Sequence, residues 1–270
     1  MKKYCVLLGL MVSLVACRQD PTPPPMSQAE LKGMATSMTP QVQQMANLAA
    51  TLQFGGLPMS LMPMGIQKQE DSCIVTTGNT ADTDKDGIPS NVTYTYNCTF
   101  GSNEVKGTAV LKDKNDADAK SGATYTIDMN LKMSASDQQG NFTLTQAIKG
   151  SMDYTPKANG GIKFEYRTSN KISATGTHNN QTVNYTGEYS YNLNSETTPD
   201  ATGVKLVFSG DASGSSNQQG HSFSGSTTFS GDVHYSNGHN GCYGIDSGSI
   251  TFKSGNNTYT LNYTGCNITQ

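Results

Sequence analysis

Apolar and polar residues alternate along most of this chain, from Cys73 to Gly265. A period of two places successive side chains on opposite faces of a β-strand, so each strand has one buried and one wet face. In one such segment the apolar positions are Tyr125, Ile127, Met129, Leu131 and Met133. Turns rich in Gly, Asn and Pro separate about eleven segments of this kind, and no helix-length crossover interrupts them. The sequence therefore predicts an all-β fold of about eleven strands in an antiparallel meander.

Several glycines fall in the apolar phase of these segments. They are Gly107, Gly150, Gly176, Gly187, Gly210, Gly225 and Gly231. Glycine inside a strand marks a bend or a close approach of the backbone, and glycines on an inner face let a sheet curl tightly. We therefore expect residues 67–270 to form a strongly curved sheet or half-barrel.

A helical, Met-rich region precedes the predicted sheet, over residues 27–66. Ser27 and Glu30 have the spacing of a capping box, and apolar residues then recur at helical spacing. Thr39 and Pro40 mark the start of a second short amphipathic helix. Thioether sulfur can bind Cu(I), but methionine is also a common core filler, and packing is the simpler interpretation.

Residues 1–16 have the form of an export signal, with two lysines before a short apolar run. The last residues of this run and the next one, LVAC ending at Cys17, resemble the lipobox of bacterial lipoproteins. The resemblance implies cleavage before Cys17 and its acylation, hence a lipid anchor in the cell envelope. In that family an aspartate after the cysteine favours the inner membrane, so Arg18 points to the outer membrane. Residues 17–26 then form a Pro-rich tether. The alternative is an ordinary signal peptide with a coincidental cysteine.

Charge and motif content narrow the class of protein. Without the predicted signal the chain has 16 basic and 21 acidic residues, a net charge of −5 with His neutral. This balance argues against a nucleic-acid partner, which requires a basic patch. The sequence has no nucleophile elbow, phosphate loop or paired-carboxylate motif, so we predict that the protein is not an enzyme. We expect its four histidines, His178, His221, His234 and His239, to be solvated loop residues.

Four cysteines follow Cys17 in the chain: Cys73, Cys98, Cys242 and Cys266. Their grouping favours two local disulfides, Cys73–Cys98 and Cys242–Cys266, which an exported protein can form. Zinc binding is the alternative, but no pair has the close Cys-x-x-Cys spacing of a zinc site.

The stretch DTDKDGIPSN places Asp82, Asp84 and Asp86 at alternate positions before a glycine. Alternate carboxylates can converge on one hard cation, with the Ile88 carbonyl as a further ligand. The stretch resembles the calcium loops of thrombospondin type 3 and EF-hand proteins, and the resemblance implies a structural calcium ion. It departs from the EF-hand at Thr93, where that family has a bidentate glutamate. The alternative is a solvated acidic turn.

Ten residues of the apolar phase are candidates for the wall of a ligand cavity: Met129, Leu131, Phe142, Leu144, Phe164, Tyr166, Tyr185, Tyr189, Leu206 and Phe208. An anchored lipoprotein with meander strands and apolar helices is similar in architecture to the Lol-type lipoprotein carriers. Those are open β-barrels whose helices cover a hydrophobic cavity for acylated cargo. The resemblance implies that this protein binds or carries an apolar or acylated ligand. One alternative is a structural or surface-interaction lipoprotein with a solid core and no ligand. Another is a transmembrane barrel, which shows the same alternation.

Overall fold

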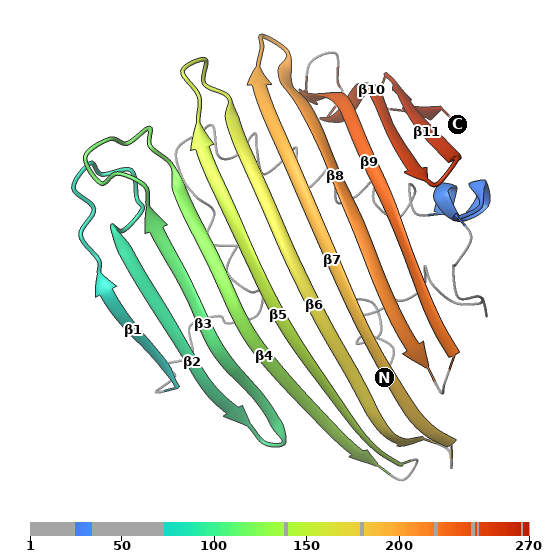
Figure 1. The fold of residues 1–270 in the computed structure, drawn as a ribbon. Helices are drawn as coiled ribbons and strands as arrows, with labels where there is room; N and C mark the ends of the chain where they lie inside the picture. Colours follow the sequence, from blue (N-terminus) through green and yellow to red (C-terminus); the bar gives the residue numbers. More distant parts are fainter. Residues whose placement is uncertain are drawn as a thin grey trace.

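A single antiparallel sheet makes up almost all of the described structure. The computed structural model describes residues 25–33, 73–137, 140–178, 181–218, 221–238, 241, 243–265 and 267–269. Its twelve strands pair in sequence order (Figure 1). They are β1 (Ile74–Asn79), β2 (Asn91–Phe100), β3 (Asn103–Asp113), β4 (Ala123–Asp137), β5 (Gly140–Pro156), β6 (Ile162–His178), β7 (Gln181–Pro199), β8 (Gly203–Gln218), β9 (His221–Asn237), β10 (Tyr243–Ser254), β11 (Asn257–Thr264) and β12 (Asn267–Thr269). The predicted all-β antiparallel meander is confirmed, with a short twelfth strand beyond the expected eleven.

The sheet is open, and its edge strands are much shorter than its central ones. β4 to β9 contain 15 to 19 residues each, where about five or six is usual. By contrast, β1 has six residues and β12 has three. Each of these edge strands pairs with one neighbour only, so the described strands do not close into a barrel. Short edge strands leave few unpaired backbone groups for another chain to join.

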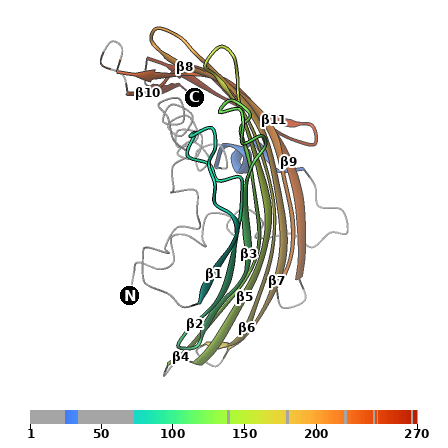
Figure 2. The same cartoon turned by 90° about the vertical axis from the view of Figure 1, so that its left-hand side faces the viewer.

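The sheet bends into an arc, and its apolar face is the concave one. Register places Met129, Ile148 and Asn170 in one row across β4 to β6, and the same phase carries the apolar residues of the other long strands. Figure 2 shows the helical residues 28–33 on the concave side of the arc. Leu31 of this helix packs against the apolar residues of the sheet, which identifies the concave side as the apolar face.

Buried side chains on the concave face form three separate clusters. The edge cluster is Tyr96, Ala109 and Met129. The middle cluster is Leu144, Ile172 and Ala174. The aromatic cluster is Leu193, Leu206, Phe208, Phe229, Val233, Tyr235, Ile245, Ile250, Phe252, Leu261 and Tyr263, together with Leu31. The core is therefore thickest at the β7–β11 end of the sheet and divided toward the β2 end.

Two of the glycines on the concave face make room for aromatic rings. Gly210 faces Phe229, and Gly231 faces Phe208, across β8 and β9. A Cβ atom at either glycine would lie 2.4 Å from the facing ring, whereas one at Gly225 would meet no atom within 4 Å. The sequence predicted that these glycines allow either a bend of the strand or a close approach to its backbone. Gly210 and Gly231 allow a close approach, in each case by an aromatic ring of the neighbouring strand.

A short helical segment follows Ser27. The backbone N–H of Ser27 donates to Glu30 Oε2 at 2.7 Å, and the N–H of Glu30 donates to Ser27 Oγ at 3.3 Å. This reciprocal pair is a capping box, and residues 28–33 are helical. The rest of the predicted helical region, 34–66, which includes the second helix, lies outside the described residues.

The start of this segment is fastened to the sheet. Pro25 and Met26, which the sequence places in the tether, lie at the β10–β11 turn. The N–H of Met26 donates to Ser254 Oγ at 3.2 Å, and Asn257 Nδ2 donates to the Met26 carbonyl at 2.6 Å. Leu31 is fully buried one turn later. The N-terminal segment therefore covers the aromatic cluster.

Candidate functional site

The ten predicted cavity residues share the concave face, but the three clusters divide them. Leu206 and Phe208 belong to the aromatic cluster, and Phe164 and Tyr166 pack against it. Met129 belongs to the edge cluster, and Leu131 packs against it. Leu144 belongs to the middle cluster, and Phe142, Tyr185 and Tyr189 pack against it. They form three neighbouring surfaces rather than one continuous wall.

The aromatic cluster is closed by the chain itself. The Phe229 ring lies between those of Tyr191 and Phe252, with centroid distances of 5.4 and 6.5 Å. Burial raises the pKa of Tyr191 to about 12. Leu31 and Met26 pack onto these rings from the N-terminal segment. This end of the concave face is therefore a filled core.

The edge and middle clusters differ, because no apolar residue of segment 25–33 packs against them. Two polar atoms on this part of the face are shielded from solvent and have no hydrogen-bond partner among the described residues, Tyr125 Oη and Asn170 Oδ1. Burial raises the pKa of Tyr125 to about 12, so its hydroxyl is neutral. A buried polar atom without a partner costs about 1–3 kcal/mol. A hydrogen-bond partner for either atom would remove this cost.

The three aspartates of the predicted calcium loop come together between β1 and β2. Carboxylate oxygens of Asp82, Asp84 and Asp86 lie within 4.8 Å of one another. Backbone donors already use several of these oxygens: Gly87 N–H donates to Asp82 Oδ2 at 3.0 Å, and Ile88 N–H donates to Asp86 Oδ1 at 2.8 Å. The Ile88 side chain is buried and anchors the loop. These contacts shape the loop around its own carboxylates.

Two further aspartates, which the sequence did not single out, join this group. Asp113 ends β3 and Asp116 lies in the β3–β4 loop, and their carboxylate oxygens lie within 4.8 Å of one another and of an oxygen of Asp84. Burial raises the pKa of Asp84, and the charges of Asp113 and Asp82 raise it further. The signal in the sequence was a second acidic run, DKNDAD at 113–118. Spacing alone does not place that run beside the first.

His234 is not the solvated loop residue that we expected. It lies in β9, 17% exposed, with Nδ1 at 2.7 Å from Asp246 Oδ1 and Nε2 at 3.2 Å from Asp200 Oδ2. Burial alone would lower its pKa, but hydrogen bonds and charge from Asp246 and Asp200 outweigh burial and raise it. An imidazolium that donates from both nitrogens has no lone pair with which to accept a proton. His234 therefore bridges two carboxylates, and its raised pKa favours the protonated form. The other histidines are His178 at the end of β6, His221 at the start of β9, and His239, which lies outside the described residues.

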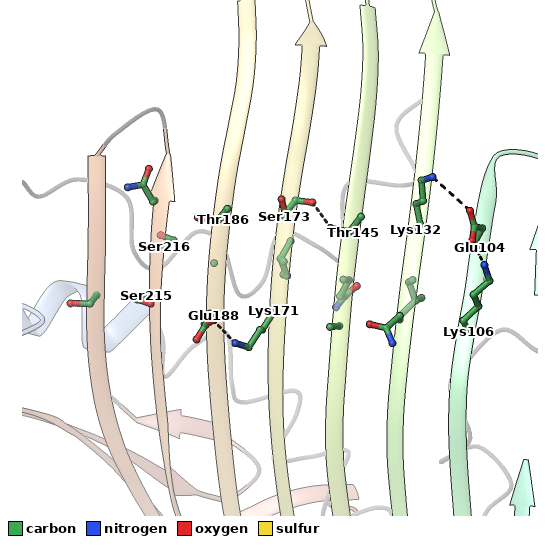
Figure 3. Close-up of a pocket in the computed structure, with 18 residues that line it drawn as sticks. Glu104, Lys106, Lys132, Thr145, Lys171, Ser173, Thr186, Glu188, Ser215 and Ser216 are labelled. Carbon is green, nitrogen blue, oxygen red and sulfur yellow. Dashed lines mark hydrogen bonds and ion pairs between the residues drawn. The ribbon is translucent and has the colours of Figure 1, made fainter. Parts of the chain in front are cut away.

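The opposite, polar face carries an open hollow of about 820 Å³ across β3 to β9 (Figure 3). Its charged side chains are three lysines and two glutamates, joined by ion pairs: Glu104 pairs with Lys106 at 2.6 Å and with Lys132 at 3.6 Å, and Lys171 pairs with Glu188 at 2.6 Å. The other lining residues are mostly Thr, Ser and Asn, and none is aromatic. Exposed ion pairs of this kind contribute little to the stability of the folded protein. Each charged side chain of the hollow takes part in an ion pair and none of its lining residues is aromatic, so we interpret it as a solvated face.

One predicted disulfide is present in the described residues. Cys73 and Cys98 are bonded and join the start of β1 to β2. The disulfide and the acidic loop therefore hold opposite ends of the same hairpin. Cys17, Cys242 and Cys266 lie outside the described residues. The Cys242–Cys266 disulfide and the lipid anchor on Cys17 therefore stay predictions.

Comparison with known proteins gives no relative: no family model, no curated protein and no solved structure matches the chain. Among the described residues, no helix combines the length and apolar character needed to cross a bilayer. An assignment of function therefore rests on the residues of the concave face and the acidic loops.

Proposed function

We propose that this protein is a lipid-anchored protein of the cell envelope that binds an apolar or acylated molecule on the concave face of its sheet. The binding surface is the part formed by the edge and middle clusters, and the protein performs no chemistry on its ligand. One observation carries the proposal. Tyr125 Oη and Asn170 Oδ1 are buried, have no partner in the described part of the chain, and lie on an apolar surface that residues 25–33 do not cover.

The chemistry of this surface favours an amphiphile. Each methylene of an acyl chain that is buried on it contributes about 0.8 kcal/mol. A hydroxyl or amide N–H of a head group would satisfy Asn170 Oδ1, and a carbonyl would accept from the Tyr125 hydroxyl. A molecule with an acyl chain and a small polar head group combines both contributions.

The lipobox sequence supports a position close to a membrane, and its Arg18 favours the outer one. The chain from Cys17 to Pro25 has eight residue steps, which span at most about 28 Å when fully extended. Pro25 lies at the β10–β11 turn. A lipid on Cys17 therefore holds that end of the sheet within about 28 Å of the bilayer surface, where acylated molecules are available.

A second candidate is a structural or surface-interaction lipoprotein with a solid core. Met129 and Leu144 expose only 4% and 5% of their surface. Such low exposure favours a face that is already packed. In that case no ligand forms hydrogen bonds with Tyr125 and Asn170, and their unsatisfied polar atoms lower the stability of the fold.

Titration of the full-length protein with a fluorescent long-chain fatty acid separates the two candidates. We expect saturable binding by the wild type, and binding about tenfold weaker in Asn170→Leu, because about 1.4 kcal/mol of hydrogen bonding is lost. The matched control is Asn130→Leu, which changes the same residue type on the polar face and should bind like the wild type. Absence of saturable binding by the wild type supports the solid core. An equal loss in both variants means that the probe does not use the concave face.

A further inference from the structure

Two acidic loops meet at one end of the sheet. The β1–β2 loop and the β3–β4 loop lie side by side (Figure 1). Three hydrogen bonds join them through Asp116: Thr83 N–H donates to Oδ1 at 2.8 Å, Thr83 Oγ1 donates to Oδ2 at 2.7 Å, and Ser90 Oγ donates to Oδ2 at 2.6 Å. The fold therefore holds carboxylates from two separate stretches of sequence in one place.

Asp113 is buried at this junction with one oxygen unsatisfied. The residue is 3% exposed. Its Oδ1 accepts from Asn115 N–H at 3.1 Å and from Ser121 Oγ at 2.8 Å, whereas its Oδ2 has no partner among the residues that the structure describes. Asp84 Oδ2 is also shielded from solvent and has no partner within the described ranges. Two unpaired carboxylate oxygens in one acidic group are costly unless a cation lies between them.

No basic side chain of the described residues supplies that charge. Among the ion pairs of the described structure, none involves Asp82, Asp84, Asp86, Asp113 or Asp116. Lys114, which follows Asp113 directly, pairs instead with Asp153 at 2.6 Å. The described residues therefore offer this acidic group no basic partner.

We propose that Asp84, Asp113 and Asp116 bind a calcium ion that fastens the β1–β2 loop to the β3–β4 loop. The three offer oxygens within 4.8 Å of one another, and oxygen-only sites of flexible geometry suit calcium, whose bonds are about 2.3–2.6 Å long. This set differs from the one that the loop motif indicates. Both oxygens of Asp82 accept backbone N–H groups, whereas Asp84 and Asp113 each keep one shielded oxygen without a partner among the described residues. The site is independent of the function proposed for the concave face.

The ion has a definite structural consequence. It closes the end of the β1–β2 hairpin that is opposite the Cys73–Cys98 disulfide, and it joins that hairpin to β3 and β4. The edge of an open sheet is thereby held at both ends.

The test uses full-length protein in mild detergent, freed of metal by a chelator and titrated with calcium chloride. Calcium at about one hundred times its dissociation constant should raise the melting temperature of the wild type by about 5–10 °C. Asp113→Asn keeps an acceptor at Oδ1 and removes the unpaired charge. It should weaken calcium binding at least about tenfold, the loss that is usual even for residues behind the ligands, and should raise the melting temperature of the metal-free protein. Asp118→Asn makes the same charge change in the same loop, outside the group, and should leave calcium binding unchanged.

The proposal is overturned by any of three results. The wild type does not bind calcium, or Asp113→Asn binds it as tightly as the wild type, or Asp118→Asn loses binding to the same extent. The second result would mean that calcium is bound by Asp82, Asp84 and Asp86, without Asp113.

Discussion

At the scale of single residues, the packing of the concave face depends on cross-strand pairs of one phenylalanine and one glycine. Phe208 lies over Gly231, and Phe229 lies over Gly210, on adjacent strands. Each ring occupies the volume that a side chain on the neighbouring strand would fill. The aromatic cluster can therefore be dense while the two strands keep their normal spacing.

Gly231→Ala should destabilise the protein. The new methyl group would lie 2.4 Å from Phe208 Cζ, and the ring must move in a packed core, at a cost of about 1–3 kcal/mol. Gly225→Ala is the control on the same strand, because its methyl group meets no atom within 4 Å, and it should be neutral or slightly stabilising. Urea unfolding followed by tyrosine fluorescence measures both. Equal stabilities of the two variants would contradict the packing described for Phe208.

His234 gives a stability that depends on pH. Its raised pKa means that its contribution is fully present below the ordinary value of 6.5 and is lost as pH rises through the folded-state value. The pKa of Asp200 is lowered to about 2, chiefly by hydrogen bonds from Thr202 and also by His234. The contribution of Asp200 to stability is therefore lost only as pH falls toward 2. Lys205, the cross-strand neighbour of His234, pairs with Asp232 at 3.0 Å and does not offset this bridge between carboxylates.

His234→Gln should therefore lower the free energy of unfolding by about 1–2 kcal/mol at pH 6 and by much less at pH 9. Urea unfolding by circular dichroism at the two pH values tests this, with His178→Gln at the end of β6 as the control. The same loss at both pH values would mean that His234 is not protonated where it bridges the two carboxylates.

At the scale of elements, the N-terminal segment acts as part of the sheet's core. Its capping box starts the helix, Met26 hydrogen-bonds to Ser254 and Asn257, and Leu31 enters the aromatic cluster. The helical part described is only residues 28–33. So short a helix has little stability of its own, and its order comes from this docking.

Leu31→Ala should cost about 2–4 kcal/mol, because it leaves a cavity among the rings of a closed core. Gln28→Ala, one turn earlier and exposed, should change stability by less than about 0.5 kcal/mol. Chemical denaturation of the two variants beside the wild type makes the comparison. If Leu31→Ala is as stable as Gln28→Ala, the segment does not contribute to the core.

The sequence predicted those elements whose signals are local. The alternation along β4 to β9, the capping box at Ser27 and the Cys73–Cys98 disulfide each depend on residues that are close along the chain. Features that depend on register were not predictable. Asp113 joins Asp84 only because two hairpin loops meet, and His234 meets Asp200 and Asp246 from a turn and a neighbouring strand. The phase of the cavity residues was right, but their division into three clusters depends on how the strands pair.

At the scale of the whole molecule, the protein is an open arc whose two ends are built differently. The end formed by β1 and β2 has a short edge strand, a disulfide and the acidic loops. The β11 end is a filled core closed by the N-terminal segment, from which the predicted tether leads to Cys17. The apolar surface of the edge and middle clusters lies away from that filled core and carries two polar atoms without a partner among the described residues. This asymmetry is what we expect of a fold that keeps one stretch of its concave face for a ligand.

Native mass spectrometry of the full-length protein, purified from its own host in mild detergent, tests this account most directly. A covalent lipid on Cys17 appears in both native and denaturing spectra, whereas a molecule on the concave face appears only in the native one. We predict that the native mass exceeds the denatured mass by that of one acylated molecule, and that Asn170→Leu carries less of it. Identical native and denatured masses would contradict the account and leave the solid core as the better description.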